Sequence, residues 1–187
     1  MTQNERLKMK HMMTLAVVVI GLGVSGIFAA DDGRNVMGEP IEVWSVEQGE
    51  MISTTRVEKS DDEWRQELPP EVYKITRRKG TEMSCSGAHW KNDREGVYRC
   101  VACGNDLFVS TTKYTSGTGW PSFFEPVHDA NIGAEHDMSM GMVRTEVHCE
   151  RCESHLGHVF PDGPKPTGKR YCINSLSMEF VEMEVDQ

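Results

Sequence analysis

Cys100-Val-Ala-Cys103 and Cys149-Glu-Arg-Cys152 are two Cys-x-x-Cys pairs, and the fold has to bring them together. Two residues between thiolates let both sulfurs of a pair turn toward one tetrahedral ion, about 2.3 Å from each sulfur. Gly104 follows the first pair, where a tight turn favours a residue that tolerates positive φ. Four thiolates leave zinc no open position, so we expect one structural Zn²⁺ bound by Cys100, Cys103, Cys149 and Cys152.

Residues 104–148 separate the two pairs, more than in a zinc ribbon, so a whole subdomain must loop out between them. Two alternatives would use the same cysteines. Redox Cys-x-x-Cys motifs sit at helix starts in βαβ settings, which this sequence lacks. Disulfide bonding after export is the other alternative. Zinc is favoured over both, because two such pairs rarely arise together by accident.

The composition indicates one domain with appendages rather than two full domains in 187 residues. The formal net charge of −9 would repel phosphate backbones, which argues against a nucleic-acid partner. From Gly80 onward, short β-prone runs alternate with Gly, Pro, Asn and Asp clusters, the pattern of a mainly β, mostly antiparallel domain. No phosphate-cradling glycine motif is visible, so no organic cofactor is expected.

The N-terminus has the pattern of a secretory signal over residues 1–30. Basic residues from Arg6 to Lys10 precede an apolar run, Leu15–Ala30, that is shorter than the roughly 20 residues of a comfortable membrane span. Cutting after Ala30 would leave bulky Phe28 at the third position back, so an uncleaved membrane anchor stays open. Either interpretation places the remaining chain outside the cytosol, in the periplasm, outside the cell, or tethered to the membrane.

The segment 31–58 is polar and lacks long periodicity, so we expect a flexible linker, although Ile41–Trp44 could form a strand. A capping box, Ser60 followed by Glu63, predicts the start of a short helix. Leu68-Pro-Pro70 predicts its end, because proline cannot continue the helical hydrogen bonds. The main domain is therefore expected over residues 59–187.

The stretch Lys169–Ser175 is typical of a strand, in which alternation places Arg170, Cys172 and Asn174 on one face. A guanidinium lowers the pKa of a neighbouring thiol, and an amide can bind an oxygen atom close by. Cys172 is therefore a candidate nucleophile. A buried cysteine that serves as a small hydrophobe is the alternative on this stretch alone.

Two histidines and a tryptophan favour the reactive interpretation. His155 and His158 begin three residues after Cys152, so a metal-bound turn would direct both imidazoles and make them candidate proton donors. Trp120, between Gly119 and Pro121, would form a wall for a small apolar group. For both His155 and Trp120, a purely structural place in the core stays an alternative.

Several of these motifs together resemble the methionine-R-sulfoxide reductases. The similar stretches are Arg-Tyr-Cys-Ile-Asn-Ser (170–175), His-Leu-Gly-His-Val-Phe (155–160), Gly-Trp-Pro-Ser-Phe (119–123), Met-Val-Arg-Thr-Glu-Val (142–147), Gly-Thr-Glu (80–82) and both Cys-x-x-Cys pairs. They occur in the same order between about Ser60 and Glu182. The resemblance implies two antiparallel sheets meeting at an angle (a β-tent) with short N-terminal helices, and zinc bound away from the catalytic pocket.

The resemblance also implies a reaction. Cys172 would attack the sulfur of protein-bound methionine-R-sulfoxide and become a sulfenic acid as methionine leaves. His155, His158 and Asn174 would hold and protonate the oxygen, and Arg170 would help to activate the thiol. Trp120 would pack against the methyl group, with Phe160 as a second substrate-binding residue. The expected role is repair of oxidised exported proteins.

One departure from the family concerns the resolving thiol. Many members have cysteine in a Ser-Gly-Cys-Gly-Trp motif, and Thr118 occupies that position here. Cys85 is the remaining cysteine outside the metal site, in the small-residue stretch 83–87. We expect a transient Cys85–Cys172 disulfide that a thioredoxin-like protein reduces, with burial of Cys85 in the core as the alternative.

Two other function classes are alternatives to a sulfoxide reductase. A peroxidase or acyltransferase could use Cys172 with His158, but an acyltransferase needs a carboxylate that orients the histidine, and none stands out in the sequence. A non-catalytic zinc-binding interaction module would need the four zinc thiols and could dispense with Cys172 and Trp120.

Overall fold

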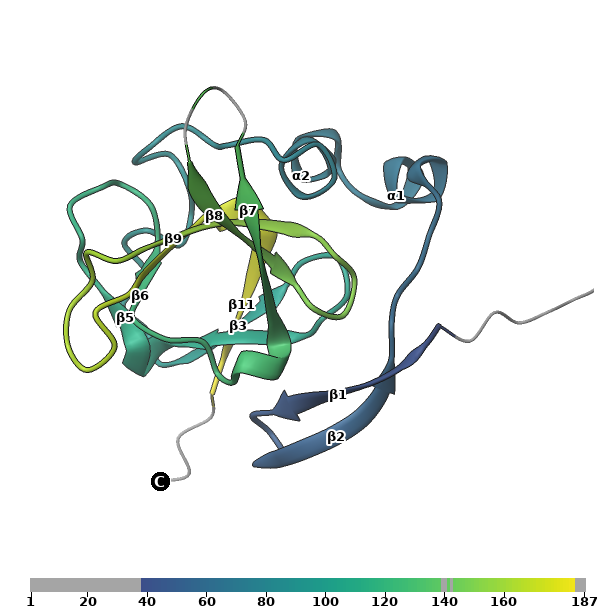
Figure 1. The fold of residues 1–187 in the computed structure, drawn as a ribbon, viewed down its shortest axis with the longest axis horizontal. Coiled ribbons are helices and arrows are strands. Elements are labelled where there is room, and N and C mark those ends of the chain that lie inside the picture. Colours follow the sequence, from purple (N-terminus) through teal and green to yellow (C-terminus); the bar gives the residue numbers. More distant parts are fainter. Residues whose placement is uncertain (1–37, 139–140, 142, 184–187) are drawn as a thin grey trace, which may run out of the picture. The chain divides into compact units, whose positions relative to one another are not determined.

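The computed structural model describes residues 38–138, 141 and 143–183 (Figure 1). The elements are β1 (Pro40–Ser45), β2 (Glu50–Thr55), α1 (Asp61–Glu67), α2 (Pro70–Thr76), β3 (Gly96–Cys100), β4 (Asp106–Val109), β5 (Lys113–Tyr114), β6 (Ser122–Phe123), β7 (Ile132–Asp137), β8 (Arg144–Cys149), β9 (His155–Phe160), β10 (Arg170–Ile173) and β11 (Met178–Glu182). The signal predicted for residues 1–30 lies outside the described residues. Within the described ranges, neither helix is long and apolar enough to cross a membrane.

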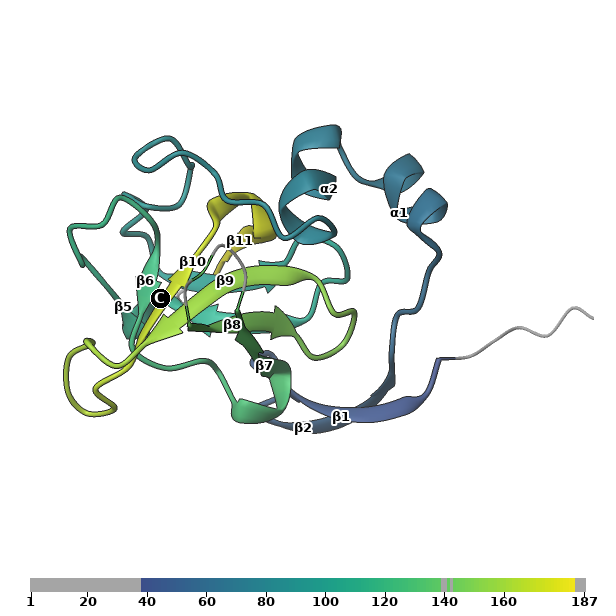
Figure 2. The ribbon, with the colours of Figure 1, turned by 45° about the horizontal axis from the view of Figure 1, so that its top comes forward.

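Two antiparallel sheets form the body of the domain, which confirms the mainly β prediction (Figures 1 and 2). The larger sheet has the order β5-β6-β10-β9-β8-β7, and the smaller has the order β11-β3-β4. Aromatic side chains join the sheets in the core. Phe108 of β4 stacks on Phe123 of β6 with ring centroids 4.3 Å apart, and Tyr98 of β3 meets the same ring edge-on at 5.1 Å.

The larger sheet is amphipathic. Leu156, Tyr171 and Ile173 are buried in the core cluster. Pairing places Cys172 opposite His158, and His158 opposite Glu146, so these three side chains lie on the other face. We call this second face of the six-stranded sheet the site face. Strand alternation therefore separates the residues that hold the fold from those available for chemistry.

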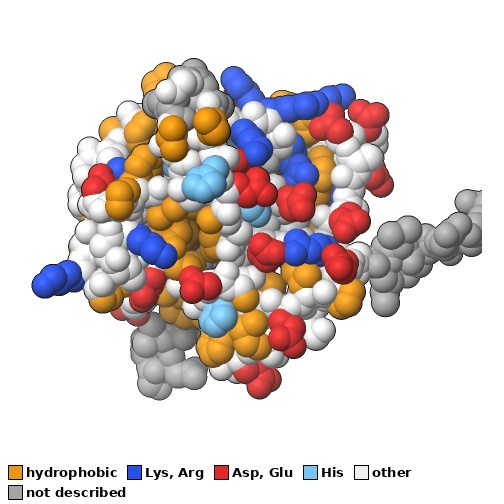
Figure 3. All heavy atoms as spheres, in the orientation of Figure 1, with side chains coloured by type: hydrophobic (Ala, Val, Ile, Leu, Met, Phe, Trp, Pro, Cys, Tyr) orange, Lys and Arg blue, Asp and Glu red, His pale blue; other side chains and the backbone are white. Residues whose placement is uncertain are grey.

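Both predicted helix signals are confirmed. The backbone N–H of Ser60 donates to the Glu63 carboxylate at 2.7 Å, and the N–H of Glu63 donates back to the Ser60 hydroxyl at 3.4 Å. α1 ends at Glu67, before the two prolines, and buries Trp64. α2 packs against β9 and the turn at 175–177. Figure 3 shows basic and acidic side chains side by side over the helices, where Asp61 pairs with Arg65 and Arg78.

The prediction of a flexible linker over residues 31–58 is wrong for residues 40–55. β1 and β2 form a hairpin in which Val43 is buried. The buried Asn131 side chain binds the edge of β1, because its Oδ1 accepts from the Trp44 N–H at 2.8 Å and its Nδ2 donates to the Trp44 carbonyl at 2.9 Å. The Val46 N–H donates to Asp106 Oδ2 at 2.8 Å. A two-stranded hairpin is marginal alone, and these partners lie far away in the sequence.

Asn131→Ala should release this hairpin. The substitution leaves both backbone groups of Trp44 without their partner, so we expect the free energy of unfolding to fall by about 2–3 kcal/mol. Hydrogen exchange followed by mass spectrometry should show the loss of protection concentrated in residues 40–55. Gln48→Ala, at an exposed position of the hairpin turn, is the control and should change neither quantity. Unchanged protection in Asn131→Ala would contradict this account of docking.

Candidate active site and metal centre

The four paired cysteines meet at the junction of two hairpins. Cys100 ends β3 and Cys149 ends β8, while Cys103 and Cys152 lie in the turns that lead to β4 and β9. All four sulfurs lie within 4.8 Å of one another, and the Cys100–Cys152 and Cys103–Cys149 pairs are each 3.6 Å apart. Zn–S bonds of 2.3 Å in a tetrahedron would separate the sulfurs by about 3.8 Å. The cluster therefore has the dimensions of a four-thiolate metal site.

The two turns have the same geometry. The N–H of Gly104 donates to the Cys100 carbonyl, and the N–H of Glu153 donates to the Cys149 carbonyl, each at 2.8 Å. Both donors have left-handed backbone, with φ of 72° and 58°. Glycine suits this conformation at the first turn, as the sequence predicted, whereas Glu153 adopts it at a cost of about 1 kcal/mol.

The chemistry of the thiols also fits a cation. A hydrogen bond that the Cys100 thiol donates to Cys103 raises the pKa of Cys100, and burial raises the pKa of Cys149. Hydrogen bonds from the other three cysteines lower the pKa of Cys152. Thiols with raised pKa values, as at Cys100 and Cys149, lose their protons when a metal cation takes their place. The sulfurs are too far apart for disulfide bonds, which need about 2.0 Å, and all six cysteines are free.

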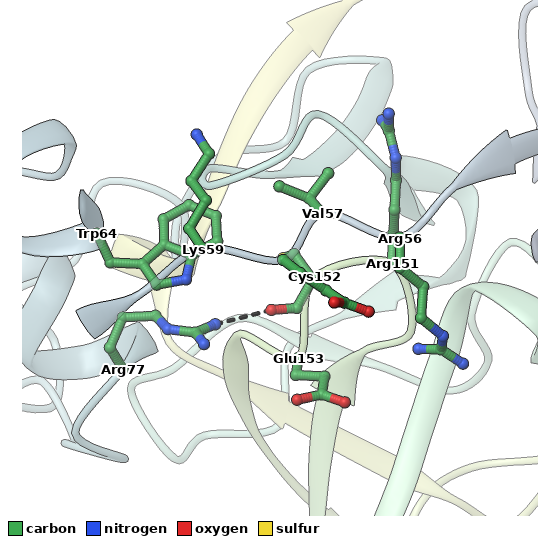
Figure 4. A pocket seen from close by; sticks show the side chains of 9 residues that line it. Arg56, Val57, Lys59, Trp64, Arg77, Arg151, Cys152 and Glu153 are labelled. Atoms are coloured by element: carbon green, nitrogen blue, oxygen red, sulfur yellow. Dashed lines mark hydrogen bonds between the residues drawn. The ribbon is translucent and has the colours of Figure 1, made fainter. Parts of the chain in front are cut away.

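A pocket of about 120 Å³ lies beside the second cysteine turn (Figure 4). The Trp64 ring lies between the Lys59 ammonium and the Arg77 guanidinium, each 4.8 Å from the ring centroid. Arg77 donates to the Cys152 carbonyl at 2.7 Å. The contacts of Trp64 and Arg77 beside this pocket thus link α1 and the end of α2 to the turn that carries Cys152.

Cys172 lies in the middle of β10 on the site face and is half-buried. It pairs with His158 of β9 on one side and with Ser122 of β6 on the other. Burial raises the pKa of its thiol, while the hydroxyl of Thr118, 4.0 Å from the sulfur, and the charge of Arg170 act in the opposite direction. Arg170 therefore has the effect predicted from the sequence, but burial outweighs it.

Arg170 is held in place by a carboxylate that the sequence analysis missed. Its Nε and Nη2 each donate to one oxygen of Asp162 at 2.9 Å, and its guanidinium lies 4.3 Å from the centroid of Phe160. Asp162 follows Phe160 by two residues, where β9 has ended. The sequence offered one signal for this contact: Asp162 is an acidic residue just beyond the end of β9, the strand whose partner β10 carries Arg170.

His155 and His158 lie together because β9 contains a bulge. Residues three apart in a regular strand point to opposite faces, yet the two imidazole centroids are 5.5 Å apart. The register between β8 and β9 shifts at Val147/His148, which brings His155 opposite His148 and turns it to the site face. The bulge comes directly after the turn that carries Cys152, and no pattern in the sequence predicted it.

Each imidazole of β9 has a carboxylate partner, one from the adjacent strand β8 and one from β7, the next strand along. His155 Nδ1 lies 2.8 Å from Glu146 Oε1, and His158 Nε2 lies 2.8 Å from Asp137 Oδ2. Burial lowers the pKa of His155, with the hydrogen bond to Glu146 acting against it. Neither carboxylate was predicted, although Glu146 lies within one of the stretches that carry the family resemblance.

Asn174 follows β10 and is buried, with its amide engaged in two hydrogen bonds. Its Oδ1 accepts from the Glu82 N–H, and its Nδ2 donates to the Leu156 carbonyl, each at 3.0 Å. The Glu82 carbonyl in turn accepts from Trp120 Nε1 at 3.2 Å. The Glu82 carboxylate accepts from the N–H groups of residues 175 and 176. Asn174 and Glu82 therefore tie the end of the reactive strand to the loop that carries the indole.

Cys85 is exposed, which excludes its burial in the core. Its N–H donates to the Gly119 carbonyl at 2.8 Å. A Cβ at Gly119, where φ is 88°, would lie 2.7 Å from the Cys85 sulfur. The loop that carries Cys85 therefore packs closely on Gly119, next to Thr118, whose hydroxyl faces Cys172.

Comparison with known proteins identifies the family. Residues 68–182 match the family described as the SelR domain. A relative named peptide methionine sulfoxide reductase MsrB, from Leptospira interrogans, is 58% identical over 124 residues, 66% of this chain and 95% of that protein. Proteins of the same name from Acinetobacter baumannii and Synechococcus sp. are 53% and 54% identical over 69% and 67% of this chain, each match covering 93% of the relative. This chain belongs to the methionine-R-sulfoxide reductase family.

Membership of this reductase family makes the chain an oxidoreductase, which confirms the predicted enzyme class. The acyltransferase and the non-catalytic zinc module are set aside.

Purified protein should contain one zinc per chain. Cys103→Ser should lose the metal and lower Tm by more than about 10 °C, because the binding energy of a structural metal is folding energy. Metal analysis and calorimetry measure both effects. Cys85→Ser is the matched control, since it removes a cysteine outside the cluster, and it should keep metal and Tm. Protein without zinc, with these four cysteines in disulfides, would refute the metal site.

The pKa of Cys172 should lie above the ordinary thiol value, and Arg170→Met should raise it further. Removing the guanidinium takes away a charge that stabilises the thiolate. The pH dependence of iodoacetamide alkylation, read on the Cys172 peptide by mass spectrometry, measures the shift. Lys169→Met removes an exposed cation one residue away and should leave the pKa unchanged. An unshifted pKa in Arg170→Met would show that Arg170 has another task.

Proposed function

We propose that this chain reduces the R epimer of protein-bound methionine sulfoxide to methionine. The observation that carries this proposal is the arrangement on the site face. There Cys172 lies on a strand directly opposite His158, and His158 lies beside His155 in an arrangement that a bulge produces. The family membership and the names of the relatives support the same reaction.

The sulfur of a sulfoxide becomes electrophilic when its oxygen is protonated or strongly hydrogen-bonded. The Cys172 thiolate attacks that sulfur while the two histidines hold the oxygen and His158 supplies a proton. The oxygen then passes to Cys172, so the cysteine sulfur is oxidised by two electrons to a sulfenic acid and the sulfoxide is reduced by two to a thioether. Trp120 and Phe160 supply apolar surface for the S-methyl group, and a wall on one side admits one epimer productively.

The metal we assign to the four-cysteine cluster is a single zinc ion. The sulfur spacing supports zinc, which prefers a tetrahedral thiolate site. When bound, zinc supplies structural cross-linking and no reactive position, because four thiolates complete its coordination. Cys100, Cys103, Cys149 and Cys152 therefore serve the fold, and the chemistry rests with the residues of the site face.

Cys85 is the resolving thiol in this proposal. Its sulfur attacks the sulfenic acid of Cys172, a Cys85–Cys172 disulfide forms and water leaves. A thioredoxin-like dithiol then reduces that disulfide by exchange. The exposure of Cys85 and its contact with Gly119, next to Thr118, support this route.

The N-terminal sequence pattern supports a location outside the cytosol. A basic start followed by the apolar run Leu15–Ala30 supports export, and an uncleaved run would tether the enzyme to a membrane. The substrates in this proposal are oxidised proteins in the same compartment.

Turnover with separated epimers tests the reaction itself. We expect the wild type to convert R-sulfoxide peptides, and not S-sulfoxide peptides, with dithiothreitol as reductant. Cys172→Ser should lose more than about 10³-fold in rate, because the nucleophile is absent. Chiral chromatography of the remaining sulfoxide measures both. Equal rates on the two epimers would refute the proposed pocket walls, and an active Cys172→Ser would refute the nucleophile.

The resolving role has a sharper test through Thr118. Cys85→Ser should release one methionine per enzyme at the normal rate in a single turnover, while turnover driven by a thioredoxin-like protein falls at least about tenfold. Adding Thr118→Cys places a thiol where the Thr118 hydroxyl now lies 4.0 Å from the Cys172 sulfur, and should restore that turnover. If Cys85→Ser cycles as fast as the wild type, the donor attacks the sulfenic acid directly.

A further inference from the structure

We propose that Glu146 and Lys79 act as a positioning pair that holds His155 in one tautomer, with hydrogen on Nδ1 and a free lone pair on Nε2. The proposal rests on the proposed function, since it assigns how one of the two site imidazoles is set for that reaction. It also gives a role to an ion pair between the exposed Lys79 and the buried Glu146, which the mechanism above leaves unused.

The three groups form a row from solvent to the interior. The Lys79 ammonium lies 2.6 Å from Glu146 Oε2, and Glu146 Oε1 lies 2.8 Å from His155 Nδ1. The exposed fraction of the side chain falls along the row, from 63% for Lys79 to 5% for Glu146 and 2% for His155. A buried carboxylate is costly unless it is paired on both sides, and both oxygens of Glu146 have partners here.

The charge state of Glu146 decides the tautomer. Burial opposes ionisation of this carboxyl group, but the hydrogen bonds from Lys79 and His155 outweigh burial and lower its pKa. An ionised carboxylate can only accept hydrogen bonds, so His155 must present Nδ1–H to it. Burial lowers the pKa of His155, and a neutral imidazole with hydrogen on Nδ1 carries its lone pair on Nε2.

His155 Nε2 is the atom left for the reaction. It is buried and has no hydrogen-bond partner among the residues that the structure describes. Its ring lies against His158 on the site face. A buried acceptor needs a hydrogen donor, and a water molecule or the O–H group formed in the reaction would supply it. The charged and titratable groups around His155 are Glu146, Lys79 and His158, with Asp137 bound to His158.

The backbone at Lys79 supports a positional role. Lys79 follows α2 with φ of 51°, a left-handed conformation that usually carries glycine at the end of a helix. A residue with a Cβ adopts it at a cost of about 1 kcal/mol. This conformation presents the Lys79 side chain to Glu146 of β8, which ties the end of α2 to the row.

Glu146→Gln tests the proposal because Lys79 donates hydrogen bonds and accepts none. The ammonium will hold the oxygen of the introduced amide, which turns the amide NH₂ toward His155. His155 must then accept at Nδ1 and carry its hydrogen on Nε2, the inverse of the wild type. Nitrogen-15 NMR of labelled histidine reads the tautomer directly. We expect kcat for the R sulfoxide to fall on the order of 10²-fold with KM little changed.

Lys79→Met combined with Glu146→Gln supplies the rescue. Without the ammonium, the amide can turn its oxygen to His155, so the double variant should regain the Nδ1–H tautomer and most of kcat. Glu135→Gln is the matched control, because Glu135 is an exposed acid on β7 that pairs with Glu146 across the strands. It should keep the wild-type tautomer and kcat, and all variants should keep their zinc.

The outcomes separate this proposal from the proposed function. A wild type that fails to reduce the R sulfoxide overturns the function. A wild type that turns over, with Glu146→Gln keeping the Nδ1–H tautomer or full kcat, overturns the positioning pair. A double variant as slow as Glu146→Gln, with the tautomer still inverted, also overturns it.

Discussion

The meeting of four sulfurs at the bases of two hairpins is the constraint on which the rest of this structure depends. One hairpin, β3–β4, belongs to the small sheet, and the other, β8–β9, belongs to the large one, so a single ion would hold the two sheets together. β9 begins three residues beyond Cys152 and carries both site histidines. The position of the four-cysteine cluster therefore sets where β9, the strand of the two histidines, begins.

The features that could be predicted from the sequence are those that depend on short-range sequence patterns. The spacing within each cysteine pair, the alternation that places Arg170 and Cys172 on one face, and the capping box at Ser60 depend on residues within a few positions of each other. Each of these patterns has one favoured geometry, and the structure contains it. The position of Cys172 and the grouping of the four cysteines could be predicted for this reason.

The features that could not be predicted depend on pairing between distant segments. Glu146 and Asp137 reach the histidines because β8 pairs with β9, and β7 pairs with β8, each in a particular register that no local pattern displays. The bulge in β9 breaks the alternation that a reader of the sequence would assume, and a strict strand would separate His155 from His158. The β1–β2 hairpin is missed for the same reason, since its contacts come from Asn131 and Asp106.

The docking of the β1–β2 hairpin also shortens the stretch of chain that could separate the domain from the proposed N-terminal anchor. A linker of 28 residues, 31–58, could extend roughly 95 Å, whereas pairing already begins at Glu39, whose carbonyl accepts from the Arg56 N–H. The eight residues 31–38 span less than about 30 Å. If the proposed apolar segment stayed in a bilayer, this short connection would keep the domain near the membrane surface, and oxidised proteins farther away would have to diffuse to it.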